Sequence, residues 1–366
     1  MREYSVKSLQ MMDAAFENLG ELAQYESVQM TRSYYGIGGT SITVDPRARN
    51  ASVLVPGVIV FFSDTPDNAY LIEDISSHAR TKMTVKGCML KGLAKRRICV
   101  PPLDAGARPY QDFGWDRFTG SAEGAYLHFA DGNLVSPDDS ARALPGLVLA
   151  DNLDRGVVLP WQARFDRLDT LFQTLGETTE IGWDIRLDLT NKQFIFQAWA
   201  GQDRTQGNNL CLISEENGNA ADVTYKAIHS GSATTAYVGG TGEDEERFIL
   251  SEGGGIQGLA RRELWSEAGS LGDPALLTLY AQNKLTDNQS KITLTATLID
   301  SGACRYRRDY DVGDKVLLSG RGYNTGVRIT EITETHENGY RTLSATFGNA
   351  PVNLGKLLTN RQSAVR

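Results

Sequence analysis

The sequence predicts a mainly β protein with an α+β insert in its middle. Short runs rich in β-branched residues fill the first part of the chain, the clearest helical stripe lies near residue 170, and period-two alternation returns afterwards. A length of 366 residues is enough for two or three domains at about 100–200 residues each. We therefore expect a first β-barrel-like domain at 1–86, an α+β insert at 87–205, a second β-barrel-like domain at 206–350 and a C-terminal tail at 351–366.

Four strands are expected in the first domain, at residues 40–44, 53–62, 69–75 and 81–85. Glycines and the turn sequence Thr65-Pro66-Asp67-Asn68 separate them. The most apolar stretch, Ala51 to Phe62, is interrupted by Pro56 and Gly57 and is shorter than the ~20 residues of a membrane-spanning helix, so we interpret it as a strand pair. Short strands at this spacing are typical of a small barrel or sandwich.

The insert is expected to begin with a short helix over residues 90–98. Its apolar side would be Leu90, Leu93, Ala94 and Ile98, and its solvated side Lys91, Lys95, Arg96 and Arg97. A loop-rich stretch follows from Pro101. The clearest helix is predicted at 162–177, where apolar residues recur at helical spacing: Phe165, Leu168, Leu171, Phe172 and Leu175. A hairpin over 183–199, turning at Thr190-Asn191-Lys192, completes a compact α+β module.

The second β domain is predicted from alternation over residues 292–298 and from a hairpin over 327–347. Asn338-Gly339 at the centre of that hairpin is a strong two-residue turn signal. One inserted helix is expected near 274–288, because Asp273 can cap it and Pro274 suits its first turn.

The charge balance restricts the class of partner. With 37 basic and 45 acidic residues the formal charge is −8, which argues against a protein that grips a nucleic-acid backbone. The first twenty residues carry charges throughout and contain no apolar run, so we expect a chain made in the cytoplasm, without a secretory signal or a membrane anchor.

The motif search predicts no catalytic residue, no cofactor and no metal. The four cysteines (Cys88, Cys99, Cys211 and Cys304) lie far apart without zinc-ligand spacing, so we expect reduced and mostly buried thiols. Phosphate-cradling P-loops, nucleophile elbows and His-Glu-x-x-His motifs are all missing from the sequence.

Two alternative functions remain open. The acidic run Glu243 to Glu246 could supply paired carboxylates for a tail-associated carbohydrate hydrolase, although a solvated loop, or a partner for Arg261 and Arg262 across a subunit boundary, is the better interpretation. Trp115 and Trp199 could serve a carbohydrate-binding adhesin, but five tryptophans spread through the chain are more typical of core or interface anchors.

A succession of motifs resembles a family of siphophage tail-tip or baseplate hub proteins, the N-terminal hub module of tail-associated proteins. The motifs span residues 25 to 350, and their order and spacing carry the resemblance more than any single one. They are Trp199-Ala-Gly201-Gln-Asp203-Arg204-Thr205, Ala236-Tyr237-Val-Gly239-Gly240-Thr-Gly242-Glu243, Glu246-Arg247, Gly258-Leu-Ala-Arg261-Arg262-Glu263 and Tyr310-Asp311-Val312-Gly313-Asp314.

The resemblance implies a homotrimer in the virion tail tip. Each chain would contribute two similar β-barrel domains to a pseudo-sixfold ring that continues the hexameric tail tube. The expected partners are the distal tail ring and tail tube proteins, tip or fibre proteins, and DNA that passes without specific binding. The interface candidates, taken from the most family-like segments, are Arg204, Tyr237, Gly239, Gly240, Gly242, Glu243, Arg247, Arg261 and Arg262.

Overall fold

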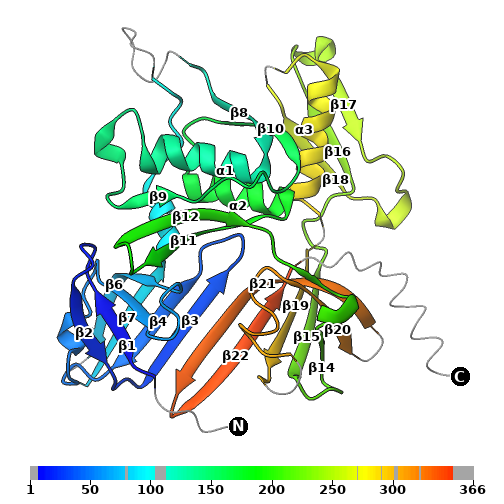
Figure 1. The fold of residues 1–366 in the computed structure, drawn as a ribbon. Coiled ribbons are helices and arrows are strands. Elements are labelled where there is room, and N and C mark those ends of the chain that lie inside the picture. The colour runs from blue at the N-terminus through cyan, green and yellow to red at the C-terminus, as the bar shows by residue number, and fades with distance from the viewer. Residues whose placement is uncertain are drawn as a thin grey trace, which may run out of the picture. The chain divides into compact units, whose positions relative to one another are not determined.

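The computed structural model describes residues 7–78, 81–103, 113–269, 271–289, 291–300, 304–320 and 323–348. It is mainly β, as the sequence predicts. The chain divides into two compact units (Figure 1). The first contains Met1–Val223 and Thr295–Phe347, and the second is built on Thr224–Leu294. The expected tail at 351–366 lies outside the described residues.

Seven strands form what we call the N-terminal β body of the first unit. They are β1 (Leu9–Met12), β2 (Asn18–Leu22), β3 (Ser27–Ser33), β4 (Gly39–Val44), β5 (Ile59–Phe62), β6 (Tyr70–His78) and β7 (Lys82–Met89). Three of the four predicted strands are confirmed as β4, β6 and β7. The strand pair expected in 51–62 is wrong: a 3-10 turn at Ala51–Val53 precedes the single strand β5, because Pro56 and Gly57 interrupt the extended backbone.

The remaining strands of the large sheet form what we call the C-terminal β body. They are β13 (Asp203–Arg204), β14 (Leu212–Ser214), β15 (Ala220–Ile228), β19 (Lys291–Leu298), β20 (Lys315–Gly320), β21 (Tyr323–Glu337) and β22 (Tyr340–Phe347). The predicted hairpin is confirmed as β21–β22. Its turn residues Asn338 and Gly339 both have positive φ (52° and 76°), as a two-residue turn of this type requires.

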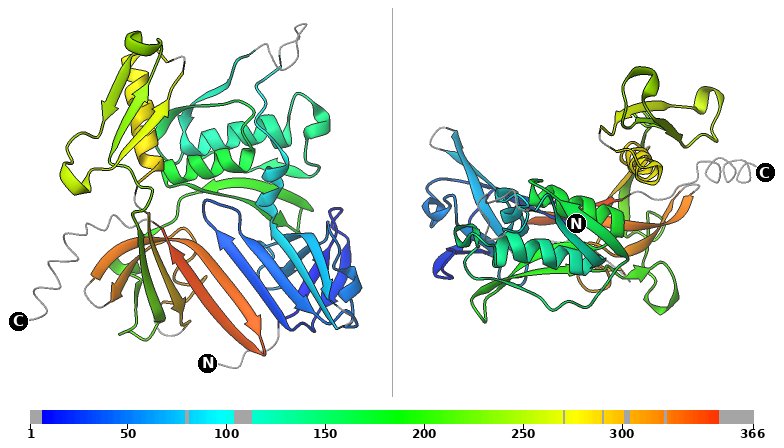
Figure 2. Two further views of the ribbon diagram at one scale, coloured as in Figure 1. Left: turned by 180° about the vertical axis from the view of Figure 1, so that it is seen from behind. Right: turned by 90° about the horizontal axis from the view of Figure 1, so that it is seen from above.

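The two β bodies meet where β3 pairs with β21, in antiparallel register from Ser33↔Glu331 to Ser27↔Glu337. The views from the front and from behind both place β3 beside the β21–β22 hairpin (Figure 2). Among the described residues the strands thus form one open 14-stranded sheet, and the expected closed barrels are not formed. The edges that could close each body are occupied by this seam.

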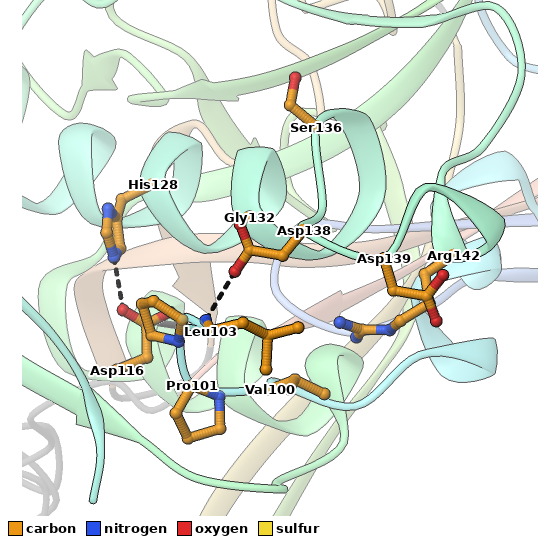
Figure 3. Close-up of a pocket in the computed structure, with 11 residues that line it drawn as sticks. Val100, Pro101, Leu103, Asp116, His128, Gly132, Ser136, Asp138, Asp139 and Arg142 are labelled. Atoms are coloured by element: carbon orange, nitrogen blue, oxygen red, sulfur yellow. Dashed lines mark hydrogen bonds and ion pairs between the residues drawn. The ribbon is translucent and has the colours of Figure 1, made fainter. Parts of the chain in front are cut away.

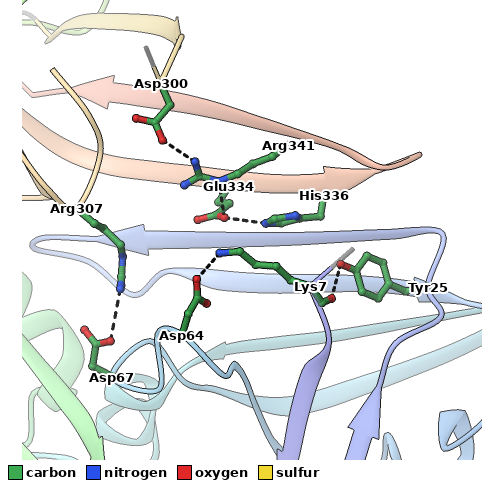
Figure 4. A network of polar contacts seen from close by, with 9 residues as sticks. All are labelled: Lys7, Tyr25, Asp64, Asp67, Asp300, Arg307, Glu334, His336 and Arg341. Atoms are coloured by element: carbon green, nitrogen blue, oxygen red, sulfur yellow. Dashed lines mark hydrogen bonds and ion pairs between the residues drawn. The ribbon is translucent and has the colours of Figure 1, made fainter. Parts of the chain in front are cut away.

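Polar contacts reinforce the seam (Figure 4). Arg32 of β3 pairs with Asp311 and donates to the Tyr306 hydroxyl at 3.0 Å. Arg307 reaches Asp67 of the N-terminal body at 3.5 Å. These ion pairs therefore join the two bodies through side chains as well as through the backbone.

A second network at the seam lies around Glu334 of β21. This carboxylate lies 2.7 Å from His336 Nε2 and accepts a hydrogen bond from Arg341 Nε, also at 2.7 Å. Arg341 in turn donates to Asp300 at 2.7 Å, and the His336 ring packs on Phe62 of the N-terminal body with centroids 4.9 Å apart.

The α+β insert packs two helices over a three-stranded sheet (Figure 1). Its regular elements are β8 (Asp116–Ser121), α1 (Ala122–Ala130), β9 (Leu147–Leu149), β10 (Val158–Ala163), α2 (Leu168–Thr179), β11 (Gly182–Asp188) and β12 (Gln193–Trp199). The hairpin predicted over 183–199 is confirmed as β11–β12. Trp183, Phe172 and Phe196 meet in its core with ring centroids 4.9 to 6.0 Å apart.

The predicted helix at 162–177 begins six residues later, at Leu168. Residues 162–163 belong to β10, and Phe165 is exposed with a positive φ of 58°, which ends the apolar stripe at Leu168. Helix α1 was not predicted, because almost all of its side chains are buried and its sequence therefore lacks an amphipathic pattern.

The short helix predicted at 90–98 is a 3-10 helix over Leu90–Arg96. Lys91 was expected on its solvated side, but the side chain is fully buried. Its ammonium donates to the carbonyl oxygens of Ser33 at 2.6 Å and Trp183 at 3.0 Å, and lies 5.0 Å from the Trp183 ring centroid. The lysine thus connects the N-terminal body to the insert.

The second unit has a sheet of three strands, β16 (Thr235–Gly239), β17 (Ile249–Glu252) and β18 (Glu263–Glu267), in the order β17-β16-β18. The helix expected near 274–288 is α3 (Pro274–Asp287). Asp273 caps it as predicted, accepting a hydrogen bond from the Ala275 amide at 2.8 Å. No helix within the described ranges is long and apolar enough to cross a membrane.

Candidate interaction site

The sheet of the second unit has one covered face and one open face. On the covered face, Ala236 and Val238 of β16 pack against Leu277 and Ala281 of α3. Because side chains alternate along a strand, the residues between them point the other way. Tyr237 and Trp265 are direct neighbours in the β16–β18 register, and Trp265 is 50% exposed. We call this side the open face of the second unit.

An arginine lies against the tryptophan on the open face. The Arg247 guanidinium is 5.5 Å from the Trp265 ring centroid and pairs with the Glu267 carboxylate. The Trp265 indole donates to the same carboxylate at 2.9 Å. These contacts lower the pKa of Glu267, first through the Arg247 hydrogen bond and then through Trp265. The ring and both charges are therefore held in a fixed arrangement.

A matching group lies around Tyr237. Arg261 donates to the Tyr237 hydroxyl at 2.9 Å and to Glu263 at 2.5 Å, and these bonds raise the pKa of Arg261. Tyr237 in turn donates to Glu263 at 3.4 Å. The open face thus carries two aromatic rings, each flanked by an arginine and a glutamate.

The glycines of the motif allow this packing. A Cβ on Gly239 would lie 2.7 Å from Arg247 Nε and 2.8 Å from the Trp265 ring, so only glycine leaves room for the stack. A Cβ on Gly240 would lie 2.5 Å from the Leu271 carbonyl oxygen, under the start of α3. Gly242 has a φ of 102°, which favours glycine at the turn into the acidic run.

Oppositely charged loops lie at the two ends of this sheet. Since β17 runs antiparallel to β16, the acidic turn with Glu243 lies at one end and the loop 253–262 at the other. All four acids of the turn are exposed. The opposite loop carries Arg262, which donates to Ser232 Oγ at 3.0 Å, and Leu259, whose side chain is fully exposed.

Arg204 is the one interface candidate outside the second unit. It lies in β13, where its side chain is 16% exposed and its Nε donates to Asp314 at 2.5 Å. Sequence reasoning missed Trp265, Glu263 and Glu267 as members of the open face. The alternation in Glu263-Leu264-Trp265-Ser266-Glu267 was the available signal, because it places all three on one side of a strand.

The structure gives little support to the alternatives. The acids Glu243 to Glu246 follow one another through a single exposed 3-10 turn, which does not set two carboxylates on opposite sides of a substrate. Trp115 is 40% exposed, but Trp199 packs edge-on against Tyr34 with centroids 5.3 Å apart. A flat pair of stacking surfaces is therefore not formed by these two residues.

A pocket of about 130 Å³ lies in the insert (Figure 3). Asp116 and His128 face each other across one side, with Nε2 2.7 Å from Oδ1, and Arg142 lies on the other. Below them, the buried Cys99 thiol donates to Asp116 at 3.8 Å. Burial, and then the Asp116 charge, raises the pKa of Cys99 to about 12. The thiol is therefore protonated at neutral pH and does not act as a nucleophile there.

Comparison with known proteins places the chain among phage proteins. The sequence profile of a family described as Siphovirus ReqiPepy6 Gp37-like protein matches residues 8–349. No curated protein sequence matches the chain.

Solved structures of tail proteins share the fold. A tail protein from Neisseria meningitidis MC58 covers 93% of this chain and 96% of its own, at 9% identity and a TM-score of 0.54. The 43 kDa tail protein of prophage MuSo2 from Shewanella oneidensis covers 93% and 97%, at 8% identity and a TM-score of 0.54. Prophage tail protein gp18 from Listeria monocytogenes EGD-e covers 98% and 99%, at 11% identity and a TM-score of 0.50. On the match of the sequence profile, which extends over nearly the whole length, the chain belongs to the family of Siphovirus ReqiPepy6 Gp37-like proteins.

Proposed function

We propose that this protein is a structural hub of a phage tail tip or baseplate. Three copies form a ring that joins the hexameric tail tube to threefold tip or fibre proteins, and the ring surrounds part of the DNA passage. Family membership and the fold shared with three tail proteins support a structural role in the tail.

The observation that carries the proposal is the pair of β bodies joined along the β3–β21 seam within one unit. A trimer can continue a sixfold tube only if each chain presents two comparable interfaces. Two β bodies fixed edge to edge by a backbone ladder and by the Arg32–Asp311 ion pair supply two such surfaces at a constant spacing.

The open face of the second unit is the proposed contact with another subunit. It contains or adjoins all the interface candidates except Arg204, which is held in an internal ion pair with Asp314. Exposed tryptophan beside arginine is the composition found at the centre of protein interfaces. The acidic turn and the arginine-bearing loop lie at opposite ends, so they suit a head-to-tail contact between copies, in which Glu243 and its neighbours face Arg262.

The net charge of −8 fits a channel that DNA slides through. Acidic or neutral walls repel the phosphate backbone and prevent it from adhering. We expect the residues that face the channel of the assembled ring to be acidic or neutral in sum, and a basic channel would contradict this part of the proposal.

Light scattering on the full chain tests the assembly. We expect a mass of three times the 40.1 kDa chain, and a shift toward the mass of one chain for Trp265→Ala combined with Arg247→Ala. Asn283→Ala, at an exposed position on α3, is the matched control and should leave the trimer intact. A monomer for the unmodified chain would overturn the trimer.

The same preparation tests the alternatives. Turnover of peptidoglycan or capsule polysaccharide that is lost in Glu243→Gln or Glu246→Gln would establish the hydrolase in place of the purely structural role. Glycan binding that Trp115→Ala or Trp199→Ala abolishes would establish the adhesin.

A further inference from the structure

Two of the four cysteines lie together in the C-terminal β body. Cys211 comes directly before β14, where its amide donates to the Arg204 carbonyl at 2.9 Å and its carbonyl accepts from the Leu317 amide at 2.9 Å. The Cys304 thiol lies 3.8 Å from the carbonyl oxygen of Leu212, the residue next to Cys211. The two thiols also share a side-chain hydrogen bond. Both residues are buried, with Cys211 1% and Cys304 6% exposed.

The contact makes the two thiols unequal. The hydrogen bond from Cys211 lowers the pKa of Cys304, while the same contact and burial raise the pKa of Cys211. The other two cysteines are different, because burial raises the pKa of Cys88 to about 11 and that of Cys99 to about 12. Cys304 is therefore the thiol with the largest thiolate fraction near neutral pH, and it has a second thiol in contact.

The pair also holds a special place along the chain. Cys211 precedes β15 and Cys304 follows β19, and these two strands pair with each other. The whole second unit, Thr224–Leu294, lies between the two cysteines in sequence. A covalent bond between them would enclose that unit in one loop.

We propose that Cys211 and Cys304 form a redox-active pair that closes to an intrachain disulfide when the protein meets a low-molecular-weight disulfide such as oxidised glutathione. The Cys304 thiolate attacks one sulfur of the small disulfide, which releases one thiolate and leaves a mixed disulfide on Cys304. The Cys211 thiol then loses its proton and displaces the second small thiol. The protein loses two electrons and two protons, and the small disulfide is reduced to two thiols.

The closed form would differ from the reduced form mainly in its unfolded state. A cross-link over a loop of this length removes much of the conformational freedom of the unfolded chain, so the melting temperature should rise on oxidation and fall again when a dithiol is added. The proposal is independent of the hub function, because it concerns one chain and no partner.

The test is oxidation of the full chain with oxidised glutathione, followed by thiol titration after denaturation and by peptide mapping without reduction. We expect two of the four free thiols to disappear and one cross-linked species, the Cys211 peptide joined to the Cys304 peptide. The double variant Cys88→Ser/Cys99→Ser is the matched control and should form the same link. Cys304→Ser should keep its three thiols and show no link.

The unmodified chain decides the outcome by itself, whether or not the buried serine variants fold. Retention of all four thiols, glutathione adducts without a Cys211–Cys304 link, or a link that involves Cys88 or Cys99 would each overturn the proposal.

Discussion

At the scale of single residues, Lys91 shows how burial changes a side chain that the sequence presents as ordinary. Two carbonyl oxygens and the Trp183 ring surround its ammonium, and no exposed fraction is left. Burial lowers the pKa of Lys91 to about 8, although the Asp184 charge acts in the opposite direction.

This shift predicts a pH dependence of stability. Between pH 8 and the ordinary lysine value of 10.5 the unfolded chain keeps a proton that the folded chain has lost. The free energy of unfolding contributed by Lys91 therefore rises with pH, by up to about 1.4 kcal/mol per pH unit. Denaturant unfolding at pH 8 and pH 9.5 should show a rise in the unmodified protein that Lys91→Met reduces.

The exposed Lys86→Met is the control for that experiment and should keep the rise of the unmodified protein. Equal pH dependence in Lys91→Met and the unmodified protein would show that the Lys91 ammonium does not lose its proton in this range.

At the same scale, the sequence indicated which residues cluster on the motif but not which side chains are buried. The spacing of Leu90, Leu93 and Ala94 made Lys91 look solvated, because helical periodicity describes one helix and carries no information on the neighbours. The neighbour that buries Lys91 is the β11 strand, which begins at Gly182, about ninety residues later.

At the scale of elements, glycine decides the structure of the open face. Gly239→Ala would place a methyl group within 2.8 Å of both Arg247 and Trp265, so the stack must shift. Overpacking of this kind costs about 1–3 kcal/mol. We expect a lower melting temperature and faster proteolysis in the second unit. Gly254→Ala, where nothing lies within 4 Å, should behave like the unmodified protein, and equal stability of both variants would contradict the packing described here.

The seam strand β21 predicts a response to acid. Burial raises the pKa of Glu334, but hydrogen bonds from His336 and Arg341 outweigh it and bring the pKa to about 2. Below the ordinary value of 4.5 the unfolded chain binds a proton that the folded chain refuses. Stability contributed by Glu334 is therefore present above pH 4.5 and lost as the pH falls toward 2.

Acid unfolding of Glu334→Gln measures this contribution. The variant should be less stable than the unmodified protein at pH 6, and the difference between the two should shrink toward pH 3. Glu337→Gln, on the same strand and with an exposed side chain, is the control. A constant difference across the range would show that Glu334 is not the titrating group.

Elements with a strong local signal were predicted well, and those set by distant contacts were not. The β21–β22 hairpin follows from Asn338-Gly339, and α3 from Asp273 and Pro274. The start of α2 could not be predicted, because residues 162–163 are drawn into β10 by pairing with β8. Pairing partners far apart in sequence leave no mark in a local pattern.

At the scale of the whole molecule, the family resemblance predicted more than periodicity did. It gave the tail family, which the profile match confirms, while the residues alone gave the succession β, α+β, β. Neither predicted that β3 and β21 would join both β bodies into one sheet. Strand pairing over about three hundred residues depends on edges that become neighbours only in the folded chain.

The central claim is that three chains supply six β bodies around one channel. Electron cryomicroscopy of the purified full-length protein tests it most directly, because class averages count chains and β bodies together. We predict rings of three chains with six β bodies around a central opening and an acidic or neutral channel wall. Single chains, or rings with a different number of chains, would contradict it.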